Sequence, residues 1–288
     1  MSMSTSVLKR PSTGTIGRWA ILLIAAIYFI GPLVAAISFT VKTPGGGVSL
    51  GAYSEIFHAP PNGQISFLQS ATYSLGITAG TIVLALGLMV PTQILLHLYV
   101  PRAKPVVEVI SLLPLVFPPV VLVVGVSDIY QATAPSGTST GGFVFQLLKW
   151  IRDDNHPLLL VILYAVMTLP FVYRTINTGI ESINLRTLVE ASRNLGASWG
   201  TTIVKVVMPA LRTSMINAAF LCFALGMGEY TVAGILSYSK PFPVWLAQLP
   251  TQSGQEQAAV SVFSLILVEA ALLVVSSLSL RRTKKGRA

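Results

Sequence analysis

The chain has 288 residues, of which 53% are hydrophobic and 10% are charged, and its formal net charge is +9. An ordinary soluble domain carries roughly 25% charged residues, so this composition excludes a water-soluble fold and indicates a membrane protein. The positive charge is explained by Lys and Arg gathered on the cytoplasmic side of a membrane, and it predicts no nucleic-acid partner.

Six apolar runs are long enough to cross a bilayer, which needs roughly 20 residues per helix. They lie at 19–41, 71–97, 106–130, 157–178, 212–236 and 258–280. The sequence therefore predicts an all-α membrane protein with six transmembrane helices in a single domain over 19–280. An N-terminal tail at 1–18 and a basic tail at 281–288 flank this domain. The first run is too long for the core of a cleaved signal peptide, so we expect it to be retained.

The third run contains three prolines, Pro114, Pro118 and Pro119. Because proline removes a helical hydrogen bond, this run is expected to kink or unwind where neighbours or water satisfy the freed carbonyls. Such a helix fits a transport pathway better than a lipid-facing position. Apolar residues at helical spacing in 143–151 then predict a short helix on the outer surface.

The distribution of basic residues predicts the orientation. If the N-terminus is inside, fifteen of the 19 Lys and Arg residues fall in cytoplasmic segments and four in outer loops. Since basic residues concentrate in cytoplasmic loops, both termini and the polar segment 181–210 are expected in the cytoplasm. The histidines fall in separate predicted loops, which predicts no shared metal site. They are His58, His97 and His156.

The polar segment 181–210 has the pattern of a helix, a glycine turn and a second helix. Asn184 is placed to cap the first helix, Gly196 to end it in a left-handed conformation, and Ser198 to cap the second. One stripe of the first helix is expected to be packed: Leu185, Leu188, Ser192 and Leu195. An amphipathic connector on the membrane surface fits this pattern too. A DNA-binding helix-turn-helix is disfavoured, because both ends are tied to membrane spans.

This segment resembles the Glu-Ala-Ala…Gly…Ile-x-Leu-Pro signature of ABC-importer permeases. The matching residues are Glu190, Ala191, Gly196 and Pro209. Ser192 stands at the second Ala, and Val206 and Met208 stand at Ile and Leu. The resemblance implies the type I importer fold and an inner-membrane, multi-pass subunit of a bacterial binding-protein-dependent transport system.

The resemblance also implies the partners. In the family this element docks in a groove of a separate cytoplasmic ATPase dimer, which binds ATP and Mg. Close approach would use Ala191 and Gly196, and Arg186 and Arg193 would reach acidic rims while Glu190 pairs with a basic group. A second permease, expected to be a different homologous chain, and an extracytoplasmic substrate-binding protein complete the system.

The chain itself lacks the Gly-x-x-x-x-Gly-Lys-Ser/Thr pattern of a phosphate-binding loop. We therefore expect it to bind no cofactor and to be a transport subunit rather than an enzyme, with ATP hydrolysis in another chain. The basic tail 281–288 is expected to flank the last span, where it can also contact anionic membrane lipid.

Charged groups inside spans usually face protein or water, so they are candidates for the translocation path. The candidates are Glu229, Tyr230, Asp128 and Glu269. Glu229 is the sharpest, because the flanking Gly226 and Gly228 let another backbone approach. An acidic residue there suits a cationic solute. A structural hydrogen bond between helices is the alternative role.

The run Gly-Glu-Tyr-Thr at 228–231, followed by Phe-Pro-Val-Trp-Leu at 242–246, resembles one branch of these permeases. That branch includes the polyamine, ferric-iron, thiamine and 2-aminoethylphosphonate permeases, and the spermidine/putrescine type is the most similar. The resemblance implies a polyamine or another small cation as the solute. The alternative function is a stand-alone transporter driven by an ion gradient through Glu229 and Glu269. A non-transport scaffold would leave these acids unexplained.

Overall fold

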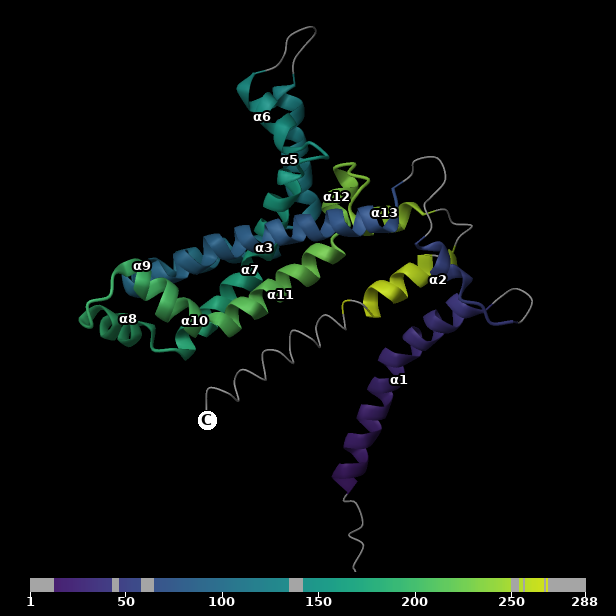
Figure 1. Ribbon diagram of the computed structural model, residues 1–288, viewed down its shortest axis with the longest axis horizontal. Coiled ribbons are helices and arrows are strands. Elements are labelled where there is room, and N and C mark those ends of the chain that lie inside the picture. The colour runs from purple at the N-terminus through teal and green to yellow at the C-terminus, as the bar shows by residue number, and fades with distance from the viewer. Residues whose placement is uncertain are drawn as a thin grey trace, which may run out of the picture. The chain divides into compact units, whose positions relative to one another are not determined.

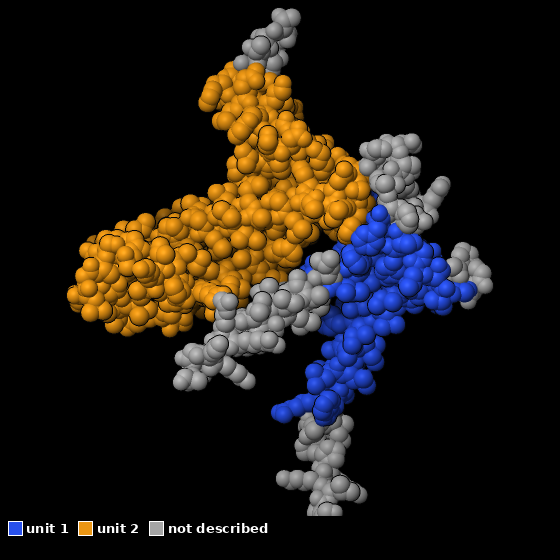
Figure 2. Space-filling view, viewed as in Figure 1, with its two compact units in different colours: residues 1–58, 249–288 blue, residues 59–248 orange. Residues whose placement is uncertain are grey.

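The computed structural model describes residues 13–42, 47–57, 65–134, 142–249, 254–255, 257–266 and 268. The chain divides into two compact units, residues 1–58 with 249–288 and residues 59–248, coloured blue and orange in Figure 2. The regular structure of the described residues is helical apart from an isolated β-bridge between Lys42 and Val48, which agrees with the predicted all-α fold.

The first unit is built from both ends of the chain. Its helices are α1 (Thr13–Val41), α2 (Gly51–Glu55) and the apolar helix Gln257–Ile266. The hydroxyls of Thr40 and Tyr53 lie 2.8 Å apart and join α1 to α2. The Gln255 side chain donates a hydrogen bond of 2.6 Å to the Lys42 carbonyl. Most of the predicted span 258–280 lies outside the described residues.

Three long helices form the centre of the second unit, and each packs against the other two (Figure 1). They are α3 (Phe67–Leu98), α7 (Leu158–Ser182) and α11 (Arg212–Gly228). Their facing side chains are apolar and fully buried at Val172, Ile176 and Cys222. A Cβ atom on Gly179 would lie 2.1 Å from the Ser214 hydroxyl, so the glycine permits the close approach of α7 and α11.

The third predicted span is broken into two helices, α4 (Lys104–Val116) and α5 (Pro119–Thr133). The axis turns by 92° between them. Phe117 and Pro118, at the break, have extended backbone dihedrals, and the following Pro119 cannot supply an N–H to continue the helix. The kink that the prolines predict is therefore confirmed. The predicted short helix is also confirmed as α6 (Phe143–Ile151), and its place on the outer surface stays a prediction.

The fifth predicted span differs from the expectation of one continuous helix. After α11 the backbone is extended at Glu229, and a short helix, α12 (Thr231–Ile235), follows. A further helix, α13 (Phe242–Gln248), packs against α3 and α11. Within the described residues, four helices are long and apolar enough to span a membrane, or five if the bent pair α4–α5 is one span. The predicted number of six, the single domain and the cytoplasmic termini stay predictions.

Candidate functional site

A cavity of about 310 Å³ lies where two broken helices meet in the second unit. One wall is the bend between α4 and α5, residues 114–119, and another is the end of α11 with Gly226 and Glu229. Helix α7 supplies the wall between them. Both breaks therefore place irregular backbone beside a cavity, which is where a membrane protein tolerates it.

Glu229 lines this cavity and also makes structural contacts. One carboxylate oxygen accepts a hydrogen bond of 2.9 Å from the backbone N–H of Val232 in the first turn of α12. The Tyr164 hydroxyl on α7 donates a hydrogen bond of 3.1 Å to the Glu229 carbonyl oxygen. The structural role is confirmed by these two hydrogen bonds. The side chain also lies at the cavity wall, and its role in a translocation path stays a prediction.

The other predicted path residues lie elsewhere. Asp128 is on the exposed surface of α5 and does not line the cavity. Tyr230 is 51% exposed, and its ring lies against Gly234 instead of the cavity. Glu269 lies outside the described residues. Of the four candidates, the structure brings Glu229 to the cavity.

Sequence reasoning missed the residues that α7 contributes to the wall. They are Tyr164, Met167, Thr168 and Phe171. Their spacing of three, one and three places them on one face of the helix. The signal was the pair of hydroxyl-bearing residues, Tyr164 and Thr168, four positions apart in the otherwise apolar stretch 157–172. The wall that faces these residues is the break at the prolines of the third predicted span.

The cytoplasmic segment contains α8 (Leu185–Asn194), which ends at a glycine turn. Gly196 has φ of +82°, the left-handed conformation that the sequence predicts. The N–H groups of Ala197 and Gly196 donate to the carbonyls of Ser192 and Arg193, at 3.2 and 2.9 Å. These two bonds are the Schellman arrangement, which satisfies the last carbonyls of the helix. Asn184 precedes α8 as predicted, but its side chain makes no capping hydrogen bond.

The second half of the segment is less regular than predicted. Helix α9 (Trp199–Thr202) is capped by Ser198, which accepts a hydrogen bond from the Thr201 N–H. A π-helical turn (Ile203–Val207) and α10 (Met208–Ala210) follow. The Met208 N–H reaches back to the Ile203 carbonyl, and the next residue, Pro209, has no N–H to donate. A π-helical turn before this proline accommodates the hydrogen bond that the proline cannot donate.

Charged side chains of the segment pair with one another on its surface. Arg186 Nε lies 2.9 Å from Glu190 Oε1, and both side chains are mostly exposed. Arg193 donates a hydrogen bond of 2.8 Å to the Ala197 carbonyl, and its guanidinium lies 5.5 Å from the centre of the Trp199 ring. These contacts satisfy polar groups of the segment within the segment itself.

Leu195 corrects the predicted packed stripe of the first helix. Leu185 is buried as predicted, whereas Leu195 is 88% exposed. The reason is that α8 ends at Asn194 and the chain then enters the Gly196 turn, so helical periodicity no longer positions Leu195. Ala191 is exposed as well. The segment thus presents an apolar tip at the turn.

His97 also departs from its predicted position in a loop. It lies in the last turn of α3, where its Nδ1 is 2.8 Å from the Gln93 carbonyl. The residues that the structure describes contain no group of three or more His, Cys, Asp or Glu side chains arranged to hold a metal ion.

Comparison with protein families gives one match, to the family described as "Binding-protein-dependent transport system inner membrane component", over residues 98–285. This range includes the bent helices, the cavity wall and the whole cytoplasmic segment. The chain is 27% identical over 185 residues to a probable ABC transporter permease protein, y4fN, of Sinorhizobium fredii, covering 62% of this chain and 30% of that one.

Other relatives carry more specific names. The spermidine/putrescine transport system permease protein PotC of Escherichia coli is 21% identical over 263 residues, covering 90% of this chain and 92% of that one. The sulfate transport system permease protein CysT of Salmonella typhimurium is 28% identical over 161 residues, covering 54% and 57%. The chain therefore spans less than two thirds of the y4fN and CysT proteins.

A solved structure shares the fold. It is a chain of a bacterial ABC transporter involved in the import of the acidic polysaccharide alginate, with a TM-score of 0.67 and 19% identity over 96% of this chain and 99% of that one. The relatives are permease subunits, which are transport components and not enzymes. On the family match and this shared fold, the chain belongs to the inner-membrane components of binding-protein-dependent transport systems.

Proposed function

We propose that the chain forms the translocation pathway of an ATP-driven importer and is coupled to a separate ATPase through the segment 181–210. The observation that supports the coupling role is the self-capped turn at Gly196 with Leu195 88% exposed beside it. Burial of Leu195 in an apolar pocket of a partner would remove this side chain from water, which is favourable. Arg186 and Glu190, earlier on α8, form a surface ion pair that can exchange partners.

The proposed system contains four kinds of partner. A cytoplasmic ATPase dimer binds ATP and Mg and receives the segment 181–210. A second permease, a different homologous chain, completes the pathway. An extracytoplasmic substrate-binding protein delivers the solute to the outer loops, and membrane lipid surrounds the spans in a bacterial inner membrane. Closure of the ATPases on ATP shifts the bundle between two states, which is linkage between distant sites.

For the solute we propose a polyamine or another small cation. The support is the Glu229 carboxylate at the wall of the 310 Å³ cavity, where a cation can approach it. Substituting Glu229→Gln keeps a hydrogen-bond acceptor for Val232 and removes the charge. We expect ATP-driven uptake of a polyamine to fall by about tenfold, the equivalent of about 1.4 kcal/mol. Asp154→Asn is the matched control, because this exposed carboxyl group lies away from the cavity. Unchanged uptake by Glu229→Gln would remove it from the path.

The coupling proposal is tested by reconstituting the chain into liposomes with and without the ATPase and second permease of its system. Uptake that requires ATP and the binding protein is the expected result. Gradient-driven uptake by the chain alone would instead establish a stand-alone secondary transporter.

A variant then locates the docking surface. Leu195→Asp is expected to abolish ATPase binding while the protein still inserts in the membrane. Val48→Asp is the control, since this apolar residue is 81% exposed but lies in a predicted outer loop. Normal ATPase binding by Leu195→Asp would exclude the tip as the docking surface.

A further inference from the structure

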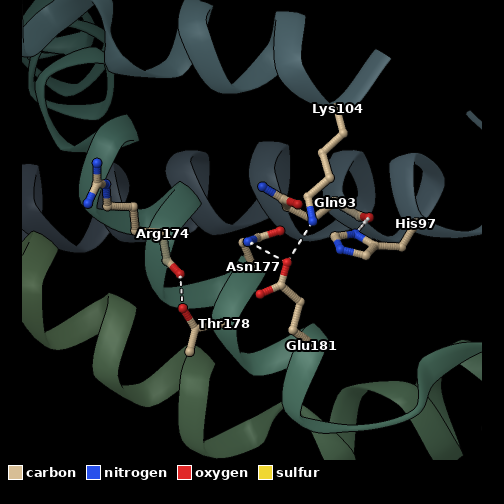
Figure 3. A network of polar contacts seen from close by, with 7 residues as sticks. All are labelled: Gln93, His97, Lys104, Arg174, Asn177, Thr178 and Glu181. Carbon is tan, nitrogen blue, oxygen red and sulfur yellow. Dashed lines mark hydrogen bonds and ion pairs between the residues drawn. The ribbon is translucent and has the colours of Figure 1, made fainter. Parts of the chain in front are cut away.

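A polar network joins α4 to α7 near their predicted cytoplasmic ends, beside Gln93 and His97 of α3 (Figure 3). Lys104 on α4 reaches across to Glu181 on α7, and its Nζ lies 2.6 Å from Glu181 Oε1. The Asn177 side chain, one turn earlier on α7, donates a hydrogen bond of 3.1 Å to the same oxygen. One carboxylate oxygen therefore receives donors from two helices.

The positions of the two charges are unfavourable for their own helices. Lys104 is the first residue of α4, where the partial positive charge of the helix lies, and Glu181 is in the last turn of α7, where the partial negative charge lies. Each helix alone would prefer the opposite charge at that end. The ion pair between Lys104 and Glu181 offsets both unfavourable interactions with the helix dipoles. The contact between the two helices therefore accounts for a basic residue at the start of α4 and an acidic residue at the end of α7.

Polar side-chain atoms are buried beside this pair, at the interface of α3 with α7. They are both side-chain polar atoms of Gln93, His97 Nε2, the Tyr173 hydroxyl and Asn177 Oδ1. Buried polar groups are almost always hydrogen-bonded to protein or water, so this part of the interface of α3 with α7 is a polar one. Buried apolar residues of the same helices, such as Ile94 and Ile176, pack beside these polar groups.

The network lies on a direct mechanical route from the cytoplasmic segment to the cavity. Three residues separate Glu181 from the start of α8. A cavity of about 420 Å³, lined by His97, Glu181 and the α7–α8 junction, leaves room for this junction to move. At the other end of the ion pair, Lys104 is the first residue of α4, a helix about 18 Å long that ends at the bend at Phe117. A displacement of Lys104 can therefore be transmitted along α4 to this bend. That bend lines the cavity.

We propose that the Lys104–Glu181 pair, held by Asn177, is a positioning element of transport that ties the cytoplasmic segment to α4 and so to the cavity wall. This inference rests on the proposed coupling through 181–210. It assigns no contact with the solute or ATP to these residues. Their role is to make α4 follow when α7 and α8 move with the ATPase.

The test is a charge-reversal cycle in the reconstituted importer. We would measure solute uptake and ATP hydrolysis together for Lys104→Glu, Glu181→Lys and the double variant. Each single reversal is expected to lower the solute transported per ATP by about fivefold or more, with the ATPase still bound. The double reversal restores the pair with its polarity inverted and is expected to recover most of that ratio. A pair that only stabilised the fold would change the amount of inserted protein, and the solute transported per ATP would stay at the wild-type value.

Milder variants and a control keep the test independent of folding. Partly exposed ion pairs contribute little to the free energy of unfolding, so Glu181→Gln and Lys104→Arg are expected to insert normally. Glu181→Gln should lower the ratio, and Lys104→Arg should preserve it. Glu108→Gln is the matched control on α4, because this exposed carboxyl makes no ion pair within the described part of the chain.

Two results would overturn the inference. If the wild-type importer shows ATP-driven uptake and Glu181→Gln keeps the wild-type ratio, the pair does not transmit the movement, while the proposed function stands. If the wild-type complex hydrolyses ATP without any uptake, the proposed function itself fails and the positioning role fails with it.

Discussion

The hydroxyl oxygens of Ser192 and Thr202 lie 3.0 Å apart in the buried interior of the cytoplasmic segment and join α8 to α9. Thr202 is fully buried and Ser192 is 9% exposed. Ser192 is the position at which the sequence departs from the Glu-Ala-Ala signature. The structure gives that departure a reason, because a serine here supplies the partner that the buried threonine hydroxyl needs.

Ser192→Ala is expected to destabilise the segment by about 1 kcal/mol, because it leaves the Thr202 hydroxyl buried without a partner. Amide hydrogen exchange of peptides from 181–210 should become faster, while exchange in α3 stays unchanged. The double variant Ser192→Ala/Thr202→Val should recover most of the protection, since no buried polar atom is then left unpaired. Equal protection in the single variant and the wild type would contradict this account.

Gly196→Ala is expected to destabilise the turn by about 1 kcal/mol, since a Cβ disfavours the left-handed conformation. ATPase binding and uptake should both weaken, because the apolar tip at Leu195 loses its fixed position.

Gly200→Ala provides the matched control for the turn. Gly196 and Gly200 both have open space where a Cβ would stand, and only Gly196 has a positive φ. Gly200 is inside α9, so alanine there should leave ATPase binding unchanged. Equal loss of binding by both variants would contradict a role for the left-handed conformation of Gly196.

Gly179→Ala is expected to lower the free energy of unfolding by about 1–3 kcal/mol through overpacking of α7 against α11. The added Cβ would lie 2.1 Å from the Ser214 hydroxyl and 2.5 Å from its Cβ. Thermal unfolding in detergent measures the loss. Ser214→Gly in the same chain should restore part of the stability, and a failure to do so would place the clash elsewhere.

Thr168→Leu is expected to reduce uptake by enlarging a side chain at the cavity wall. Substrate-stimulated ATP hydrolysis should fall less than uptake, because the cytoplasmic segment is untouched. Thr175→Val is the control on the same helix, since Thr175 bonds the Phe171 carbonyl of its own helix and does not line the cavity. If Thr168→Leu supports full uptake, the solute does not pass this wall.

The sequence was most informative where local chemistry decides the structure. Pro118 and Pro119 predicted the broken third span, and Gly196 predicted the left-handed turn, because each residue acts on its own backbone. The break at Glu229 was missed, since no proline marks it and the carboxylate that stabilises it bonds an N–H three residues later. Helical periodicity placed Leu195 on a packed face, although α8 ends at Asn194, one residue before it.

Contacts between distant segments were beyond sequence reasoning. Lys104 and Glu181 are 77 positions apart, and neither lies in a motif that points to the other. The same limit explains why the α7 wall of the cavity went unnoticed. A span that faces a cavity on one side and a packed core on the other appears in the sequence as one apolar run. Only the packing of the helices shows which of its residues face the cavity.

The bend between α4 and α5 also fixes the hydrogen-bonding character of the cavity wall. In a continuous helix the carbonyls of Pro114 and Leu115 would accept from the N–H groups of residues 118 and 119, and both of these are prolines. The wall therefore carries backbone oxygens that the helix cannot satisfy, next to a carboxylate. A solute rich in N–H or O–H groups finds acceptors there that belong to the main chain, and changes of side chain at 114 or 115 leave them in place.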